Sequence, residues 1–373
     1  MSVAEAPRPT DAEAAFIRQA RQIVNDLMRP NPLIYWADFF LSATISYTAL
    51  WLFFTTELWS WTSLVCFPIA GFGLYRTSIF IHELAHMPPT RFRLFRTIWN
   101  AGFGVPFLAP SFIYTDHRAH HMSPTYGTPD DSEYYQLGPS RFGEVVRSFV
   151  MLPIVPFYPL IRFGLLGPLS LLHPAIRRVV WQRASSLGTF SPAYRRADPD
   201  EYERRIVWIQ EIGCFLVVAG LFGCLFAGVF SWAVFWKLYA VYLFVMIVNA
   251  LRVYAAHGYS SGGEPMTFVE QMLDSTTVQG GPWSALWAPL GMRFHALHHL
   301  FPTMPYHTMA RAHRRLMRQL PTDSLYHATL RPSLWGAIRK MIRSANVSPP
   351  RESSIGALAP RSRTRAAVKQ VLR

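Results

Sequence analysis

Residues 207–257 read VWIQEIGCFLVVAGLFGCLFAGVFSWAVFWKLYAVYLFVMIVNALRVYAAH, two long apolar runs with only the stretch Phe230–Trp232 between them. A helix needs about 20 apolar residues to cross a bilayer, and each run is that long. So short a connection leaves room only for a tight turn. The stretch therefore predicts a membrane hairpin with spans at about 207–230 and 233–257.

A second hairpin is predicted nearer the N-terminus. Its spans cover about 33–56 and 63–83, joined by the short stretch Glu57–Trp61. Tryptophans lie near both turns, as in the aromatic belt at a membrane surface; they are Trp51, Trp59, Trp61, Trp232 and Trp236. The predicted fold class is an all-α integral membrane protein with four transmembrane helices in two hairpins.

The composition agrees with a membrane protein. Charged residues make up 16% of the 373 residues, against about 25% in a soluble domain. The net charge of +14 accompanies long apolar runs, so we expect an anionic membrane face as the partner and no nucleic acid. The three cysteines, Cys66, Cys214 and Cys224, lie in apolar runs and are expected to be packing residues.

The arginines predict an orientation. The two hairpin turns contain no Lys or Arg, whereas the N-terminal segment, residues 84–206 and the C-terminal part are rich in Arg. By the positive-inside rule both termini and the long middle segment are cytoplasmic. The expected location is a bacterial inner membrane, crossed several times.

Three regions are expected to differ from the spans. Residues 1–32 form an N-terminal segment whose helix at 11–28 has one apolar face, and this helix either lies on the membrane or packs like any other. Within a membrane domain covering 33–345, residues 98–114 and 145–172 are apolar but broken by Pro or Gly, and they predict interfacial or partly inserted pieces. Residues 346–373 predict a disordered basic tail.

Nine of the 13 histidines form clusters at helical spacing. The clusters are His82–His86, His117–His121, the end of the fourth span at His257, and His295–His299. Spacings of three and four residues place the histidines of a cluster on one helical face, and imidazole is the commonest metal-binding side chain. The predicted topology puts all nine on the cytoplasmic side. His173, His307, His313 and His327 lie outside these spacings and are expected to be surface or capping residues.

Nine imidazoles are more than one metal ion uses, since tetrahedral zinc takes four ligands. The sequence therefore predicts two metal ions that share them. A different interpretation takes His82-Glu83-Leu84-Ala85-His86 as the H-E-x-x-H motif of an intramembrane zinc protease, with Glu83 as general base. That reading leaves seven histidines unused. A third is a receptor or scaffold that binds metal structurally and consumes no oxygen.

The pattern HELAH, HRAHH and HALHH, set around two membrane hairpins, resembles the membrane-bound fatty acid desaturase superfamily. The stretch Arg293–His307, RFHALHHLFPTMPYH, is similar to the third histidine box of the bacterial members. The resemblance covers about residues 33–315. It implies a four-span bundle with a cytoplasmic, histidine-rich helical cap, two non-haem iron ions, and dioxygen as co-substrate.

Carried over by position, the resemblance implies eight box histidines as iron ligands, namely His82, His86, His117, His120, His121, His295, His298 and His299. His257 resembles an additional ligand that some members place at the end of the fourth span. Some members also hold an Asn one turn before that His; here Val253 has that position and Asn249 lies two turns before. Asn249, Glu83 and Asp116 are the candidates for residues that support the ligands.

The resemblance implies a desaturase that introduces a double bond into the acyl chain of a fatty acid or lipid. Hydroxylases and carotenoid ketolases share the same boxes, so both remain alternatives. Such chemistry needs two external electrons, and three cysteines cannot hold an iron–sulfur cluster bound by four Cys. We therefore expect a separate electron donor, most simply a ferredoxin-type carrier. It could dock on arginines near the boxes, although these also satisfy the positive-inside rule; they are Arg91, Arg93, Arg96, Arg311, Arg314 and Arg315.

Overall fold

A computed structural model describes residues 7–88, 90–138, 140–188 and 191–344. The chain divides into two compact units. The membrane unit contains residues 31–117 and 146–250, and the C-terminal unit contains residues 1–30, 118–145 and 251–373 as far as they are described. The tail predicted at 346–373 lies outside the described residues.

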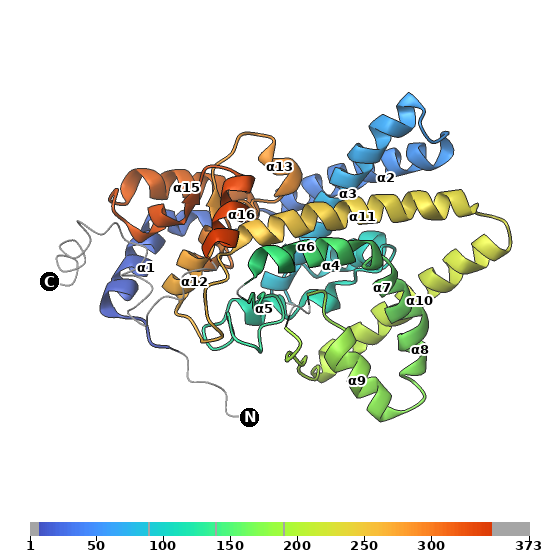
Figure 1. Cartoon of the computed structure of the whole chain (residues 1–373), viewed down its shortest axis with the longest axis horizontal. Coiled ribbons are helices and arrows are strands. Elements are labelled where there is room, and N and C mark those ends of the chain that lie inside the picture. The colour runs from blue at the N-terminus through green and yellow to red at the C-terminus, as the bar shows by residue number, and fades with distance from the viewer. Residues whose placement is uncertain (1–6, 89, 139, 189–190, 345–373) are drawn as a thin grey trace. The chain divides into compact units, whose positions relative to one another are not determined.

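The first hairpin of the membrane unit consists of α2 (Pro32–Thr55) and α3 (Trp61–His86), which run side by side (Figure 1). Asn31 caps α2 by accepting from Leu33 N, and Pro32 suits the first helical position because its missing N–H has no intrahelical partner there. Ser60 caps α3 in the same way, through Ser63 N. The Ser60 cap thus fixes where the chain leaves the hairpin turn and α3 begins.

The second hairpin consists of α10 (Glu201–Phe226) and α11 (Trp232–Ala256). All four helices are long and apolar enough to cross a membrane, which confirms the predicted spans and makes the chain a multi-pass membrane protein. The largest difference between the predicted and observed bounds is at α10, which starts at Glu201, ahead of the apolar run. It starts there because Asp200 caps it by accepting from Glu203 N. Its first, polar turn therefore precedes the span.

Shorter helical pieces follow, most of them in the membrane unit. They are α4 (Arg93–Trp99), η2 (Asn100–Gly104), η3 (Ser111–Tyr114), α5 (His117–His120), α6 (Arg141–Met151), η4 (Leu152–Ile154), α7 (Phe157–Ile161), η5 (Arg162–Leu166), α8 (Gly167–Leu169) and α9 (Pro174–Ala184). Of these, α5 and α6 have residues in both units. The segments 141–154 and 157–169 together are apolar enough for a span, but a bend of 52° separates them. This matches the break predicted within 145–172, with Pro153 and Pro156 at the bend, while its partial insertion stays a prediction.

The C-terminal unit is a helical assembly around its own core. It contains α1 (Asp11–Val24), η1 (Asn25–Leu27), α12 (Phe268–Asp274), α13 (Ser284–Trp287), α14 (His295–Leu300), α15 (Tyr306–Gln319), η6 (Leu325–Thr329) and α16 (Leu334–Arg343). Two short strands, β1 (Thr277–Val278) and β2 (Leu330–Arg331), pair in parallel.

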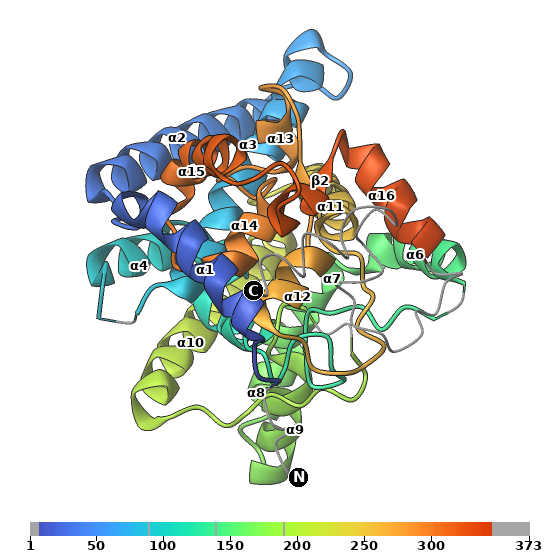
Figure 2. The ribbon, with the colours of Figure 1, turned by 90° about the vertical axis from the view of Figure 1, so that its left-hand side faces the viewer.

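Helix α1 settles one of the open alternatives. Its apolar face joins the core that α12, α14 and α15 share, and Ala20 and Val24 are fully buried there. Helix α1 lies against α15, as Figure 2 also shows. The predicted N-terminal helix therefore packs within its unit, and the alternative in which this face lies on the membrane is wrong.

Candidate metal centre

Four histidines of the C-terminal unit converge on one point. His120 ends α5, His257 follows α11, and His295 and His299 lie one turn apart on α14; each offers a ring nitrogen within 4.8 Å of the other three. The Nε2 of His295 lies 2.9 Å from the Nε2 of His257 and 3.2 Å from that of His299. All four side chains are buried.

Local structure places these rings. The four-residue spacing on α14 puts His295 and His299 on one helical face. His257 forms an antiparallel bridge with Ser275, and Thr276 N donates to Ala256 O at 2.8 Å. The end of α11 is thereby tied to the chain that follows α12.

The protonation of the rings suits a metal. Burial, and after it the charge of His120, lowers the pKa of His257 well below its usual value. Burial, and after it the charge of His257, does the same for His295. Both rings are therefore neutral at pH 7 and have a lone pair to donate. Four converging imidazoles are a donor set that fits a transition-metal ion.

Asp131 orients the His120 ring. Its carboxylate oxygens lie 2.8 and 3.1 Å from His120 Nδ1, and a carboxylate can only accept there. The Nδ1–H therefore donates to Asp131, which leaves the lone pair on Nε2. Asp131 is itself fixed because it accepts from the backbone N–H groups of Gly127 and Glu133. A carboxylate that holds a histidine in this way is typical of metal sites.

Tyr126 does the same for His257. The Tyr126 hydroxyl donates to Asp274 at 2.8 Å, so its oxygen accepts from His257 Nδ1, 2.9 Å away. This assignment leaves the lone pair of His257 on Nε2, the atom that faces His295. Tyr134 also donates to Asp274, at 2.8 Å. Burial raises the pKa of Tyr126 well above its usual value, so its hydroxyl keeps its proton.

The other five predicted ligands are divided between the units. In the membrane unit the His117 ring centroid lies 4.5 Å from that of His82 and 4.9 Å from that of His86, and the ligand nitrogens of the three lie within 4.8 Å of one another. In the C-terminal unit the Nε2 atoms of His121 and His298 are 3.1 Å apart. The second box is thus divided between the units, with His117 in the membrane unit and His120 and His121 in the C-terminal unit.

The three supporting candidates have hydrogen-bond partners in the membrane unit. Glu83 accepts from the Tyr35 hydroxyl at 2.5 Å and lies 3.9 Å from His82 Nδ1. Asn249 Oδ1 accepts from the Tyr75 hydroxyl at 3.4 Å. Their role beside the ligands stays a prediction.

Asp116, the third candidate, accepts from the Ser186 hydroxyl and lies 3.5 Å from the Arg196 guanidinium. Among the histidines outside the clusters, His173 caps α9 by accepting from Ala175 N.

The sequence interpretation missed Asp131, Tyr126 and Asp274. Asp131 follows His120 by 11 residues and Asp274 follows His257 by 17, and no single helix joins the two residues of either pair. The short turns after α5 and the bridge at Ser275 bring them back to the histidines. No spacing signal in the sequence alone points to these partners.

The fold and the site together define a multi-pass membrane protein with a buried histidine cluster that can hold a metal. A family model, Fatty acid desaturase, matches residues 58–331, and the chain belongs to that family. The family comprises membrane oxidoreductases that act on lipids and is known for di-iron sites.

The chain is also similar to a ceramide hydroxylase of Caulobacter vibrioides (strain NA1000 / CB15N). The two are 36% identical over 338 residues, which cover 90% of this chain and 95% of the relative. No solved structure matches the chain significantly.

Proposed function

We propose that this protein is an oxygen-dependent hydroxylase that converts a C–H bond in a chain of a ceramide-like lipid into C–OH. The similarity to a ceramide hydroxylase over 90% of the chain carries this proposal, because it extends through both units and all histidine clusters. In the reaction, one oxygen atom of dioxygen enters the lipid. The other leaves as water with two protons and two electrons from a donor.

The double bond predicted from the sequence has less support. Desaturation and hydroxylation draw on the same histidine boxes, so the boxes cannot distinguish the two reactions. The named relative favours insertion of oxygen.

The nine histidines are the proposed ligands of two iron ions. His120, His257, His295 and His299 suit one ion, since their ring nitrogens already converge. The remaining five box histidines complete the nine that the sequence predicts as shared ligands of two ions. The two ions, when bound, supply the activation of dioxygen. The protein residues orient the imidazoles of His120 and His257 through Asp131 and Tyr126 and, because the cluster is buried, exclude bulk water.

The proposed orientation keeps both termini on the cytoplasmic side of a bacterial inner membrane, as the arginine distribution indicates. A cysteine at the exposed position His173 should then react only with reagents that cross the membrane. Labelling of His173→Cys in intact cells by an impermeant reagent would contradict this orientation. The two electrons are proposed to come from a separate, ferredoxin-type carrier.

Mass spectrometry of lipids from cells with and without the gene tests the function. We expect ceramide-like lipids that gain one oxygen atom in cells with the wild-type gene. His295→Ala removes a converging imidazole and should abolish the product, while His173→Ala, at an exposed cap, should not. Lipids that lose two hydrogens instead would show a desaturase, and unchanged lipids would refute both reactions.

A further inference from the structure

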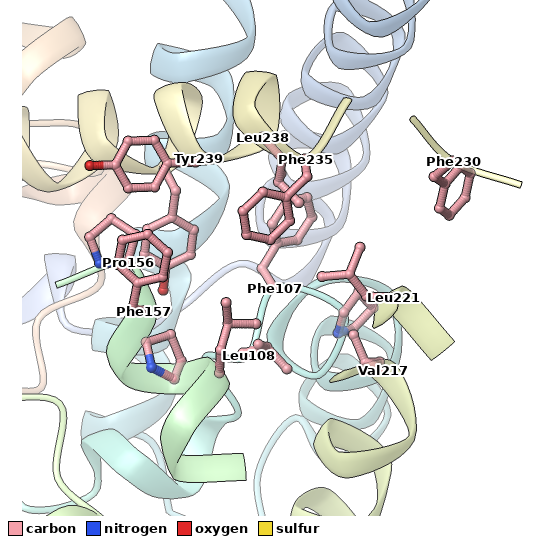
Figure 3. Close-up of a pocket in the computed structure, with 14 residues that line it drawn as sticks. Phe107, Leu108, Pro156, Phe157, Val217, Leu221, Phe230, Phe235, Leu238 and Tyr239 are labelled. Atoms are coloured by element: carbon pink, nitrogen blue, oxygen red, sulfur yellow. The ribbon is translucent and has the colours of Figure 1, made fainter. Parts of the chain in front are cut away.

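A cavity of about 300 Å³ lies in the membrane unit between α10, α11, α7 and the irregular stretch 106–108 (Figure 3). Its walls are almost entirely apolar. Phe107, Val217, Leu221, Phe235 and Leu238 are among the side chains that line it. We propose that this cavity binds the hydrocarbon chain of a membrane lipid, with its α11 side at a level of the bundle away from His82.

Ring contacts within the membrane unit fix the level of the cavity. Phe244 of α11 packs on Phe72 of α3, with ring centroids 5.0 Å apart. The residues of α11 that line the cavity lie between Phe244 and the hairpin turn, whereas His82 lies ten residues beyond Phe72 in the other direction. At 1.5 Å per residue this places the α11 side of the cavity about 15 Å along the bundle from His82.

A second contact puts the cavity at membrane depth. Tyr47, in the apolar part of α2, stacks near Phe107 with ring centroids 5.8 Å apart, and its hydroxyl donates to Gly102 O. Residues 106–108 are therefore level with the interior of a span. The backbone of this stretch is irregular, since Leu108 has a φ of +55°. Irregular backbone at membrane depth is tolerated where it is buried in protein or lines a cavity.

The apolar side chains that line the cavity favour a hydrocarbon chain as its ligand. The lining contains no charged residue, and Tyr239 uses its hydroxyl to donate to Pro153 O at 3.0 Å. The residues that line it thus offer no charged partner to a headgroup, and an apolar cavity does not hold ordered water. A straight alkyl chain fits, because 300 Å³ takes roughly ten carbon atoms if each fills about the 30 Å³ of a water molecule.

The cavity is also partly open, so a chain can enter sideways from the bilayer. Phe230, at the hairpin turn, lines it and is itself exposed. Two sources can supply the chain. One is the lipid substrate, and this interpretation rests on the proposed function. The other is a phospholipid of the bilayer, and this interpretation does not depend on the proposed function.

Photo-crosslinking tests the proposal on the full-length protein in bilayer nanodiscs. The probes are a phospholipid and a ceramide, each with a diazirine near the end of one chain. We expect both the 106–108 stretch and α11 around Leu238 to be labelled by at least one probe. Leu221→Trp or Leu238→Trp fills the cavity and should lower that labelling at least about tenfold, since each excluded methylene group costs about fourfold in binding.

Leu216→Trp is the matched control, because Leu216 lies on α10 but faces outward with 62% exposure. It should leave the labelling unchanged, and the melting temperature of each variant checks that it is folded. Displacement of the label by excess unlabelled ceramide identifies the substrate as the source, and persistence of the phospholipid label identifies the bilayer. Failure of both probes to label, or equal labelling in the filled and control variants, would overturn the proposal. The phospholipid result does not depend on hydroxylase activity.

Discussion

At the scale of the residue, the metal centre depends on side chains that are not ligands. The tautomers of His120 and His257 are set by Asp131 and by Tyr126. A ring held in this way presents Nε2 without losing conformational entropy when the metal binds. The ligands alone would therefore be an incomplete description of the site.

Asp131→Asn tests this orientation. The amide is a weaker acceptor than the carboxylate, so His120 should lose its fixed tautomer and metal affinity should fall about 10–100-fold. The measurement is iron per chain after a graded challenge with a chelator. Asp130→Asn is the control, because the neighbouring Asp130 is exposed. Equal iron retention in the two variants would show that Asp131 does not support the site.

The histidines were predictable from the sequence, and their partners were not. Within α14 a spacing of four residues fixes which rings share a face, so His295 and His299 follow from local geometry. Asp274 reaches Tyr126 across 148 residues of chain, and only tertiary packing brings them together. The sequence thus predicts those parts of the site that lie on one helix. It does not predict contacts between residues that are far apart in the chain.

At the scale of the element, the spans were predictable because hydropathy over about 20 residues decides them. The packing of the broken segment was not. Arg162 of η5 is buried and donates to Glu211 of α10, and Arg177 of α9 lies 2.7 Å from the same carboxylate. This charge network fastens η5 and α9 to α10.

Glu211→Ala should therefore destabilise the membrane unit. It leaves the buried Arg162 charge without compensation, which costs about 3–5 kcal/mol when a buried pair is broken. Thermal unfolding in detergent measures the loss. Glu201→Ala breaks an exposed ion pair with Arg205 on the same helix and should change stability by less than about 1 kcal/mol. Similar melting temperatures for the two variants would contradict the role of the network.

At the scale of the whole molecule, the electron donor is the partner still to be identified. Two of the arginines considered for its docking have contacts within the protein. Arg96 donates to Leu84 O and Met87 O, and Arg315 lies 2.5 Å from Asp26. The other four are exposed, and of these Arg311 and Arg314 lie together on α15; the four are Arg91, Arg93, Arg311 and Arg314.

The double variant Arg311→Glu, Arg314→Glu should raise the donor concentration for half-maximal rate about tenfold at low salt. The effect should fade as salt rises, because exposed charges are screened within about 8 Å at physiological ionic strength. Steady-state kinetics with an acidic ferredoxin measure it. Arg339→Glu, Arg343→Glu on α16 makes the same charge change as a control. An identical donor dependence in both double variants would show that the donor docks elsewhere.

We propose that this histidine-rich membrane protein inserts oxygen from dioxygen into a lipid. Turnover of a ceramide by the purified, iron-loaded protein under isotopically heavy dioxygen tests it most directly. We predict one heavy oxygen atom in the hydroxyl group of the product, with the normal isotope when only the water is labelled. A desaturated product without heavy oxygen, or a hydroxyl group whose oxygen comes from water, would contradict the account.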